Sequence, residues 1–90
     1  MNKFKINSLL VVQNNSDARK PTMYFDTAPV SAKHHTQLIE ESFEKKLYFE
    51  PDTMVICLEV KDDVYGINLR ILEPNSGKVG WVISGSVRSL

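Results

Sequence analysis

The chain has 90 residues, with 11 basic and 11 acidic side chains and a sequence pI of about 6.7. This size suits one domain, residues 1–90, with one modest hydrophobic core. The neutral charge balance argues against a protein that coats DNA through uniform positive charge. The ordinary hydrophobic content of 42% excludes intrinsic disorder.

The N-terminal third predicts two extended segments. Residues 4–13 predict a strand, because apolar residues recur there at a period of two. That face consists of Phe4, Ile6, Leu10 and Val12. Residues 14–21 are nearly all turn formers and predict a loop, and residues 23–25 predict a short strand.

The segment 31–47 is the place where a helix fits, and we expect the helix itself near residues 35–47, with about 12 residues. Its apolar stripe, expected to pack on the rest of the domain, consists of Leu38, Ile39, Phe43 and Leu47. Acidic residues fall on the other side, and Glu41 and Lys45 form a favourable pair one turn apart. Pro51 ends the pattern.

The C-terminal half predicts strands separated by tight turns. The expected strands are residues 54–60, 65–72, 79–83 and 87–90. Residues 73–78 predict a hairpin loop in which Gly77 supplies a positive φ. Residues 54–60 are apolar on both faces at the start, which is typical of a strand buried on two sides.

Several short strands in fewer than 100 residues indicate a small barrel or sandwich. The order of features resembles the bacterial SH3-like (SH3b-type) family over residues 22–90. The matching segments are Met23-Tyr24-Phe25-Asp26-Thr27-Ala28-Pro29, Pro51-Asp52-Thr53, Gly80-Trp81-Val82 and the expected 3₁₀ turn Ser84-Gly85-Ser86-Val87. The resemblance implies a mostly β fold, a small SH3-like barrel of five to six strands with one short helix in an insert near residues 35–47.

The single cysteine, Cys57, lies between Ile56 and Leu58, which favours a small buried hydrophobe over a reactive thiol. No intramolecular disulfide is possible, and no stretch reaches the length of a membrane span. The N-terminal residues lack the pattern of a signal peptide. These observations predict a cytoplasmic protein in a reducing compartment.

Two adjacent histidines, His34 and His35, are the other candidates for chemistry. Adjacent histidines point in different directions, whereas zinc sites prefer a spacing of three or four residues together with further ligands. We therefore expect no metal site, no cofactor and no enzymatic activity. The alternative is an enzyme or metal protein built on His34, His35 and Cys57.

The leading hypothesis is a non-enzymatic binding module, an adaptor or inhibitor that contacts another protein through an exposed face. A phage or accessory protein that modulates a host protein fits this size. The predicted protein-binding residues are Trp81, Tyr65, Tyr24 and Arg70 on the barrel and Glu40, Glu41 and Glu44 on the helix. For Trp81 the alternative is a core position beside Val79 and Ile83.

The second hypothesis is a small barrel that binds nucleic acid. Its phosphate contacts would come from the N-terminal third, which carries five basic and two acidic residues. The residues are Lys3, Lys5, Arg19, Lys20 and Lys33. No role at a membrane is predicted.

Overall fold

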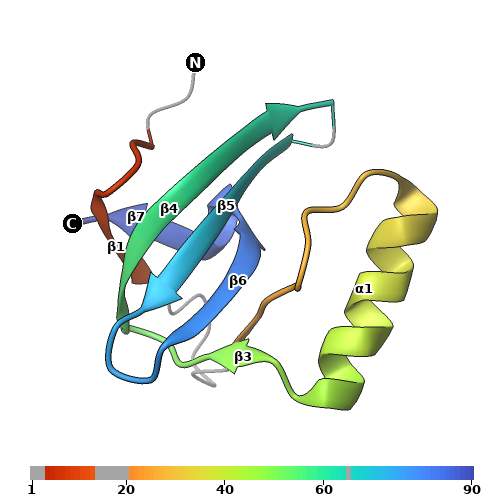
Figure 1. Cartoon of the computed structure of the whole chain (residues 1–90), viewed down its shortest axis with the longest axis horizontal. Helices are drawn as coiled ribbons and strands as arrows, with labels where there is room; N and C mark the ends of the chain where they lie inside the picture. Colours follow the sequence, from red (N-terminus) through yellow and green to blue (C-terminus); the bar gives the residue numbers. More distant parts are fainter. Residues whose placement is uncertain (1–3, 14–20, 65) are drawn as a thin grey trace.

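The computed structural model describes residues 4–13, 21–64 and 66–90, and of Asp63 the backbone alone. It is a mixed α/β domain with a five-stranded antiparallel sheet, a second sheet of two strands and one α-helix (Figure 1). In chain order the elements are β1 (Leu9–Val12), β2 (Thr22–Met23), α1 (Ala32–Lys45), β3 (Tyr48–Phe49), β4 (Met54–Asp63), β5 (Gly66–Glu73), β6 (Lys78–Ile83), the 3₁₀ turn η1 (Ser84–Ser86) and β7 (Val87–Ser89).

The large sheet has the strand order β6-β5-β4-β1-β7 and is open. The expected closed barrel is wrong, because β6 and β7 stand at opposite ends of this order and the described residues show no pairing between them. Phe25 occupies the free side of β6 instead, through an antiparallel bridge to Trp81. The mostly β character, the single helix and the number of strands in the sheet agree with the expectation.

The C-terminal half follows the sequence pattern closely. Strands β4, β5 and β6 form a meander, and the loop between β5 and β6 turns through Gly77 with a φ of 77°. The expected 3₁₀ turn is η1, and the expected last strand is β7. Burial of β4 on two sides is wrong, because Val55 and Cys57 are fully buried whereas Met54 is 49% exposed.

The predicted strand at residues 4–13 is shorter in the structure. Asn7 has a positive φ of 69°, and the Ser8 amide donates a hydrogen bond to the Lys5 carbonyl, so the chain turns before β1 begins at Leu9. The turn breaks the period of two. Phe4 still enters the core, but Ile6 is 58% exposed rather than buried.

The main core lies on the inner face of the large sheet. Its buried members are Phe4, Leu10, Val12, Tyr24, Phe49, Val55, Cys57, Leu69, Ile71, Val82 and Val87. The alternation predicted for residues 65–72 places Leu69 and Ile71 here, and both are completely buried. The ring of Tyr24 packs against Phe49, with 4.4 Å between the ring centroids.

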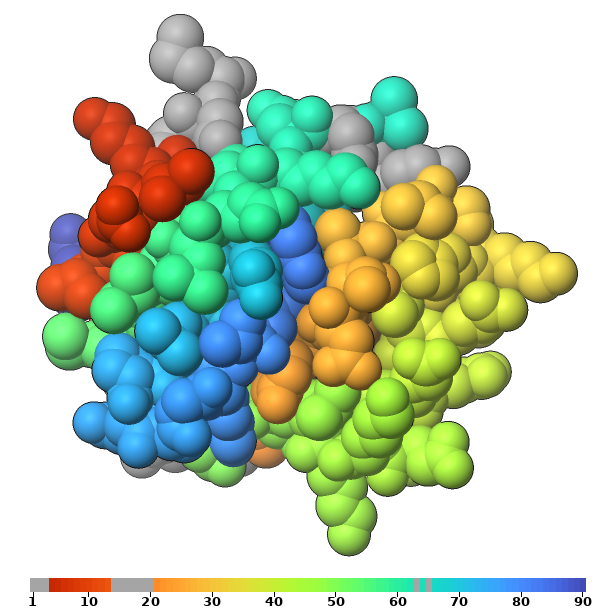
Figure 2. All heavy atoms as spheres, in the orientation of Figure 1, coloured from red at the N-terminus to blue at the C-terminus, as the bar shows by residue number. Residues whose placement is uncertain are grey.

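A second apolar cluster lies on the other side of β6 and joins the sheet to the helix. It consists of Phe25, Ala28, Leu38 and Trp81, with Met23 at its edge. In Figure 2 the segment before α1, in orange, fills the space between β6, in blue, and the helix, in yellow and green. Trp81 therefore belongs to a core, but to this second cluster and not to the main one.

Local hydrogen bonds set the two ends of α1. The Ser31 hydroxyl accepts from the His34 amide at 3.0 Å, which starts the helix earlier than the expected residue 35. Lys46 adopts the left-handed conformation, with a φ of 57°. The amides of Lys46 and Leu47 then donate to the carbonyls of Phe43 and Ser42, a Schellman ending that stops the helix at Lys45.

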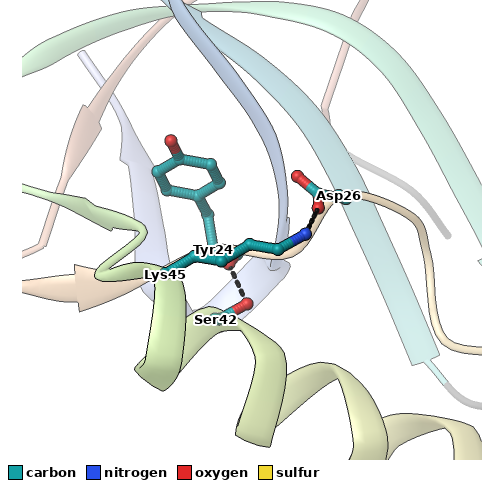
Figure 3. Close-up of polar contacts among 4 residues, drawn as sticks. All are labelled: Tyr24, Asp26, Ser42 and Lys45. Atoms are coloured by element: carbon teal, nitrogen blue, oxygen red, sulfur yellow. Dashed lines mark hydrogen bonds and ion pairs between the residues drawn. The ribbon is translucent and has the colours of Figure 1, made fainter.

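The buried face of α1 differs from the predicted stripe. Its buried residues are Leu38 and Ser42, whereas Ile39 is 40% and Phe43 70% exposed. The Ser42 hydroxyl donates to the Tyr24 carbonyl at 2.6 Å, and Lys45 pairs with Asp26 at 3.3 Å (Figure 3). A small polar residue lets the helix approach the extended segment closely, so the helix turns its larger apolar residues outward.

Gly80 offers a direct test of how the two cores share β6. It lies on the inner face of the strand, where a Cβ would overlap the ring of Tyr24. We expect Gly80→Ala to lower the free energy of unfolding by about 1–3 kcal/mol, measured by urea denaturation, because the Tyr24 ring must move out of its packed position.

Gly85 provides the matched control, because a Cβ there meets no atom within 4 Å. Gly85→Ala should therefore change stability far less than Gly80→Ala. Equal effects of the two substitutions would show that backbone freedom, and not the Tyr24 ring, explains the loss.

Candidate functional site

The outward turn of α1 creates an exposed apolar surface beside acidic side chains. Ile39 and Phe43 are one helical turn apart and so are neighbours on the helix surface. Glu40 and Glu44 follow each of them by one residue and are also exposed. We call these four residues, Ile39, Glu40, Phe43 and Glu44, the α1 outer surface.

The charges of this surface are unfavourable for the helix itself. Glu40 and Glu44 are like charges one turn apart, and such pairs destabilise a helix by about 0.2–0.5 kcal/mol. Glu44 lies in the last turn of α1, where the helix dipole disfavours negative charge, while the first turn holds no acidic residue. Helix stability therefore does not explain this arrangement, whereas a positively charged partner would relieve it.

A second exposed apolar area lies on the outer face of the large sheet. Leu9 on β1 and Met54 on β4 are 47% and 49% exposed. The strand register places them diagonally on one face, since Leu9 pairs with Ile56 and Val11 with Met54. Both are less exposed than Phe43.

The predicted barrel residues do not form the expected aromatic groove. Trp81 is 9% and Tyr24 7% exposed, so both rings belong to the cores. Arg70 is exposed and pairs in register with Trp81, and Tyr65 lies outside the described residues. Glu40, Glu41 and Glu44 are all exposed on α1.

The basic residues of the nucleic-acid hypothesis are described only in part. Lys5 and Lys33 are exposed, while Lys3, Arg19 and Lys20 lie outside the described residues. Figure 1 places the N-terminal segment that contains Lys5 and the first turn of α1 on opposite sides of the molecule. The structure does not bring these two lysines together into one groove.

The histidines and the cysteine are separate. His34 Nδ1 accepts a hydrogen bond from the Val30 amide at 3.1 Å, so this side chain serves the start of the helix. The His35 ring contacts Phe25 edge to face, and Cys57 is buried in the main core. Among the residues that the structure describes, no group of three potential metal ligands occurs.

A pocket of about 190 Å³ opens where the start of α1 meets the sheet. We call it the helix-start pocket; its walls are Pro29, Ser31, Ala32, His35, Asn68 and Ile83. Asn68 is 1% exposed, and within the described chain neither its amide nitrogen nor its amide oxygen has a hydrogen-bond partner. Such buried polar groups are uncommon because each loses its hydrogen bonds to water without replacement.

Asn68 is a pocket residue that the sequence pattern does not predict. It lies on the face of β5 opposite to Leu69 and Ile71, and the sequence pattern predicts that this face is exposed to solvent. Only the fold shows that Pro29 and α1 cover this position. No signal in the strand itself could have indicated the pocket.

Searches against protein-family models, curated proteins and solved structures found no match for this chain. Within the described residues, no helix has the length and apolar character needed to cross a membrane.

Replacing Asn68 with leucine should stabilise the protein. The substitution removes two buried polar atoms that have no partner among the described residues, and it keeps a similar volume on the outer face of β5. We expect the free energy of unfolding to rise by about 1–2 kcal/mol in urea denaturation. Asn75→Leu, in the exposed turn between β5 and β6, is the matched control and should give no such gain. A loss of stability in Asn68→Leu would contradict the assignment of an unsatisfied amide.

Burial raises the pKa of the Cys57 thiol above its ordinary value of 9.0. The unfolded chain therefore loses the thiol proton at a lower pH than the folded chain. The free energy of unfolding consequently falls as the pH rises above 9.0. Burial also raises the pKa of Tyr24, whose ordinary value is 10.0. Between pH 9.0 and 10.0 we therefore expect Cys57→Ala to make the fall in the free energy of unfolding with rising pH shallower. The measurement is urea denaturation at several pH values; an unchanged slope would refute this role for the thiol.

Proposed function

We propose that this protein is a non-enzymatic binding module that docks the α1 outer surface into another protein. The single observation that carries the proposal is the 70% exposure of Phe43 beside Glu40 and Glu44. A large aromatic side chain in water supplies the kind of anchor that dominates many interfaces. The module then acts as an adaptor or inhibitor by occupying a surface of its partner.

The chemistry of the partner follows from the four residues. An apolar groove accommodates Phe43 and Ile39, because exposed helix faces of this kind bind through residues one turn apart. Lysine or arginine at one rim of that groove pairs with Glu40 and Glu44, which lie along one side of the apolar pair. We therefore propose a protein partner that has an apolar groove with one basic rim.

A relationship to the bacterial SH3-like domains is a separate part of the proposal. In support, Gly80-Trp81-Val82 lies in β6 and leads through η1 into β7, the order of features on which the resemblance was based. The proposed relationship is to an open form of that fold. It assigns no ligand to this chain.

Affinity capture from a nuclease-treated lysate, followed by direct binding of the captured protein in purified form, tests the proposed function. We expect Phe43→Ala to weaken binding by about 30-fold or more without loss of stability, because the ring is an anchor in the complex and exposed in the free protein. The double variant Glu40→Lys, Glu44→Lys should abolish capture at moderate salt.

The control is the double variant Glu50→Lys, Glu59→Lys, which makes the same charge change at exposed positions outside α1. It should bind like the unmodified protein. If both double variants lose the partner equally, or if Phe43→Ala leaves affinity unchanged, the α1 outer surface is not the docking site. Capture of nucleic acid alone in an untreated lysate, lost as salt rises, would support the basic N-terminal residues instead.

A further inference from the structure

The helix-start pocket combines two features that its role in the fold does not explain. Its walls are mainly apolar, with Pro29, Ala32 and Ile83 among them, so water gains little there. Yet Asn68 belongs to the same wall, and its buried amide has a donor and an acceptor with no partner among the residues that the structure describes. Keeping such a group costs stability, and a site that binds a ligand is one setting in which a protein retains this cost.

The direction of the Asn68 side chain links it to the pocket and not to the main core. Leu69 and Ile71, which share one face of β5, point into the main core. Asn68 therefore leaves the strand on the opposite face, where it pairs in register with Ile83, another residue of the pocket wall. The terminal torsion of an asparagine has broad preferences, so its amide can turn toward a group in the pocket.

We infer that the helix-start pocket binds a small planar group that presents a hydrogen-bond donor beside an acceptor. A primary carboxamide and the edge of a nucleobase both have this chemistry, and both pair with an asparagine amide through two hydrogen bonds. The volume of about 190 Å³ suits a single ring or side chain and is below the range of larger ligand sites.

The other wall residues have complementary roles. His35 contributes an aromatic ring whose orientation is held by the edge-to-face contact with Phe25, at 5.5 Å between centroids. Ile83 is 51% exposed at the rim and gives the flat face of a ligand an apolar surface to cover. The Ser31 hydroxyl accepts from the His34 amide and keeps its own proton for donation.

Nuclear magnetic resonance titration of the ¹⁵N-labelled full chain tests this inference with three probes. Nicotinamide carries the carboxamide, nicotinate has the same ring but lacks the amide donor, and adenine carries the nucleobase edge. We expect nicotinamide or adenine to shift the amide signals of the pocket residues, with a dissociation constant of about 1 mM for so small a ligand. Nicotinate should bind at least about tenfold more weakly than nicotinamide.

The variant Asn68→Leu should lose at least about tenfold in affinity for whichever probe binds, while its spectrum stays that of a folded protein. Asn75→Leu, the exposed control, should bind like the unmodified chain. Binding of nicotinamide alone assigns the site to carboxamides, and binding of adenine alone assigns it to nucleobases; either result supports the donor–acceptor chemistry.

Three results would overturn the inference. They are equal binding of nicotinamide and nicotinate, unchanged affinity in Asn68→Leu, and the absence of saturable shifts with both nicotinamide and adenine. None of them bears on the α1 outer surface, because Ile39, Phe43 and the two glutamates are not part of the pocket wall.

Discussion

Two backbone hydrogen bonds between Phe25 and Trp81 hold the helical part of the molecule on the sheet. The amide of each residue donates to the carbonyl of the other, at 2.9 and 2.8 Å. Because successive side chains of an extended segment point to opposite faces, this bridge sends Tyr24 into the main core and Phe25 into the second cluster. The inner space for Tyr24 exists because Gly80 has no side chain. One short extended segment thus completes both cores.

The same segment determines how α1 sits. Its Tyr24 carbonyl accepts from Ser42, and Asp26 pairs with Lys45, so the helix is fixed along the side that carries Leu38, Ser42 and Lys45. A helix turned to bury Phe43 would lose the Ser42 hydrogen bond, leaving the Tyr24 carbonyl without that partner. The apolar surface that faces solvent is therefore a consequence of close backbone approach and not of a shortage of apolar residues in the helix.

Periodicity in the sequence was sufficient for α1 and for most strands of the C-terminal half, and insufficient for the bounds of β1, for β3 and for the assembly of the elements. The strands β5 and β6, the turn at Gly77 and the 3₁₀ turn all follow from alternation and turn chemistry, which are local properties. Closure of the sheet and the buried face of α1 depend on which segment takes the edge of β6, and no local pattern contains that information. The exposed glutamates of α1 could be found from the sequence, whereas Asn68 acquires its meaning only from the cover over β5.

Strand β1 has a consequence for the order in which the molecule assembles. Leu10 pairs with Val55 on one side and with Ser89 on the other, so this strand depends on partners from the middle and from the far end of the sequence. The meander of β4, β5 and β6 needs only short loops to form, whereas placing β1 between β4 and β7 requires the closure of two long ones. Topologies rich in such distant contacts fold slowly, with the late step set by chain closure. The meander, with the Trp81 edge that receives Phe25, is thus available before β1 and β7 are added beside β4.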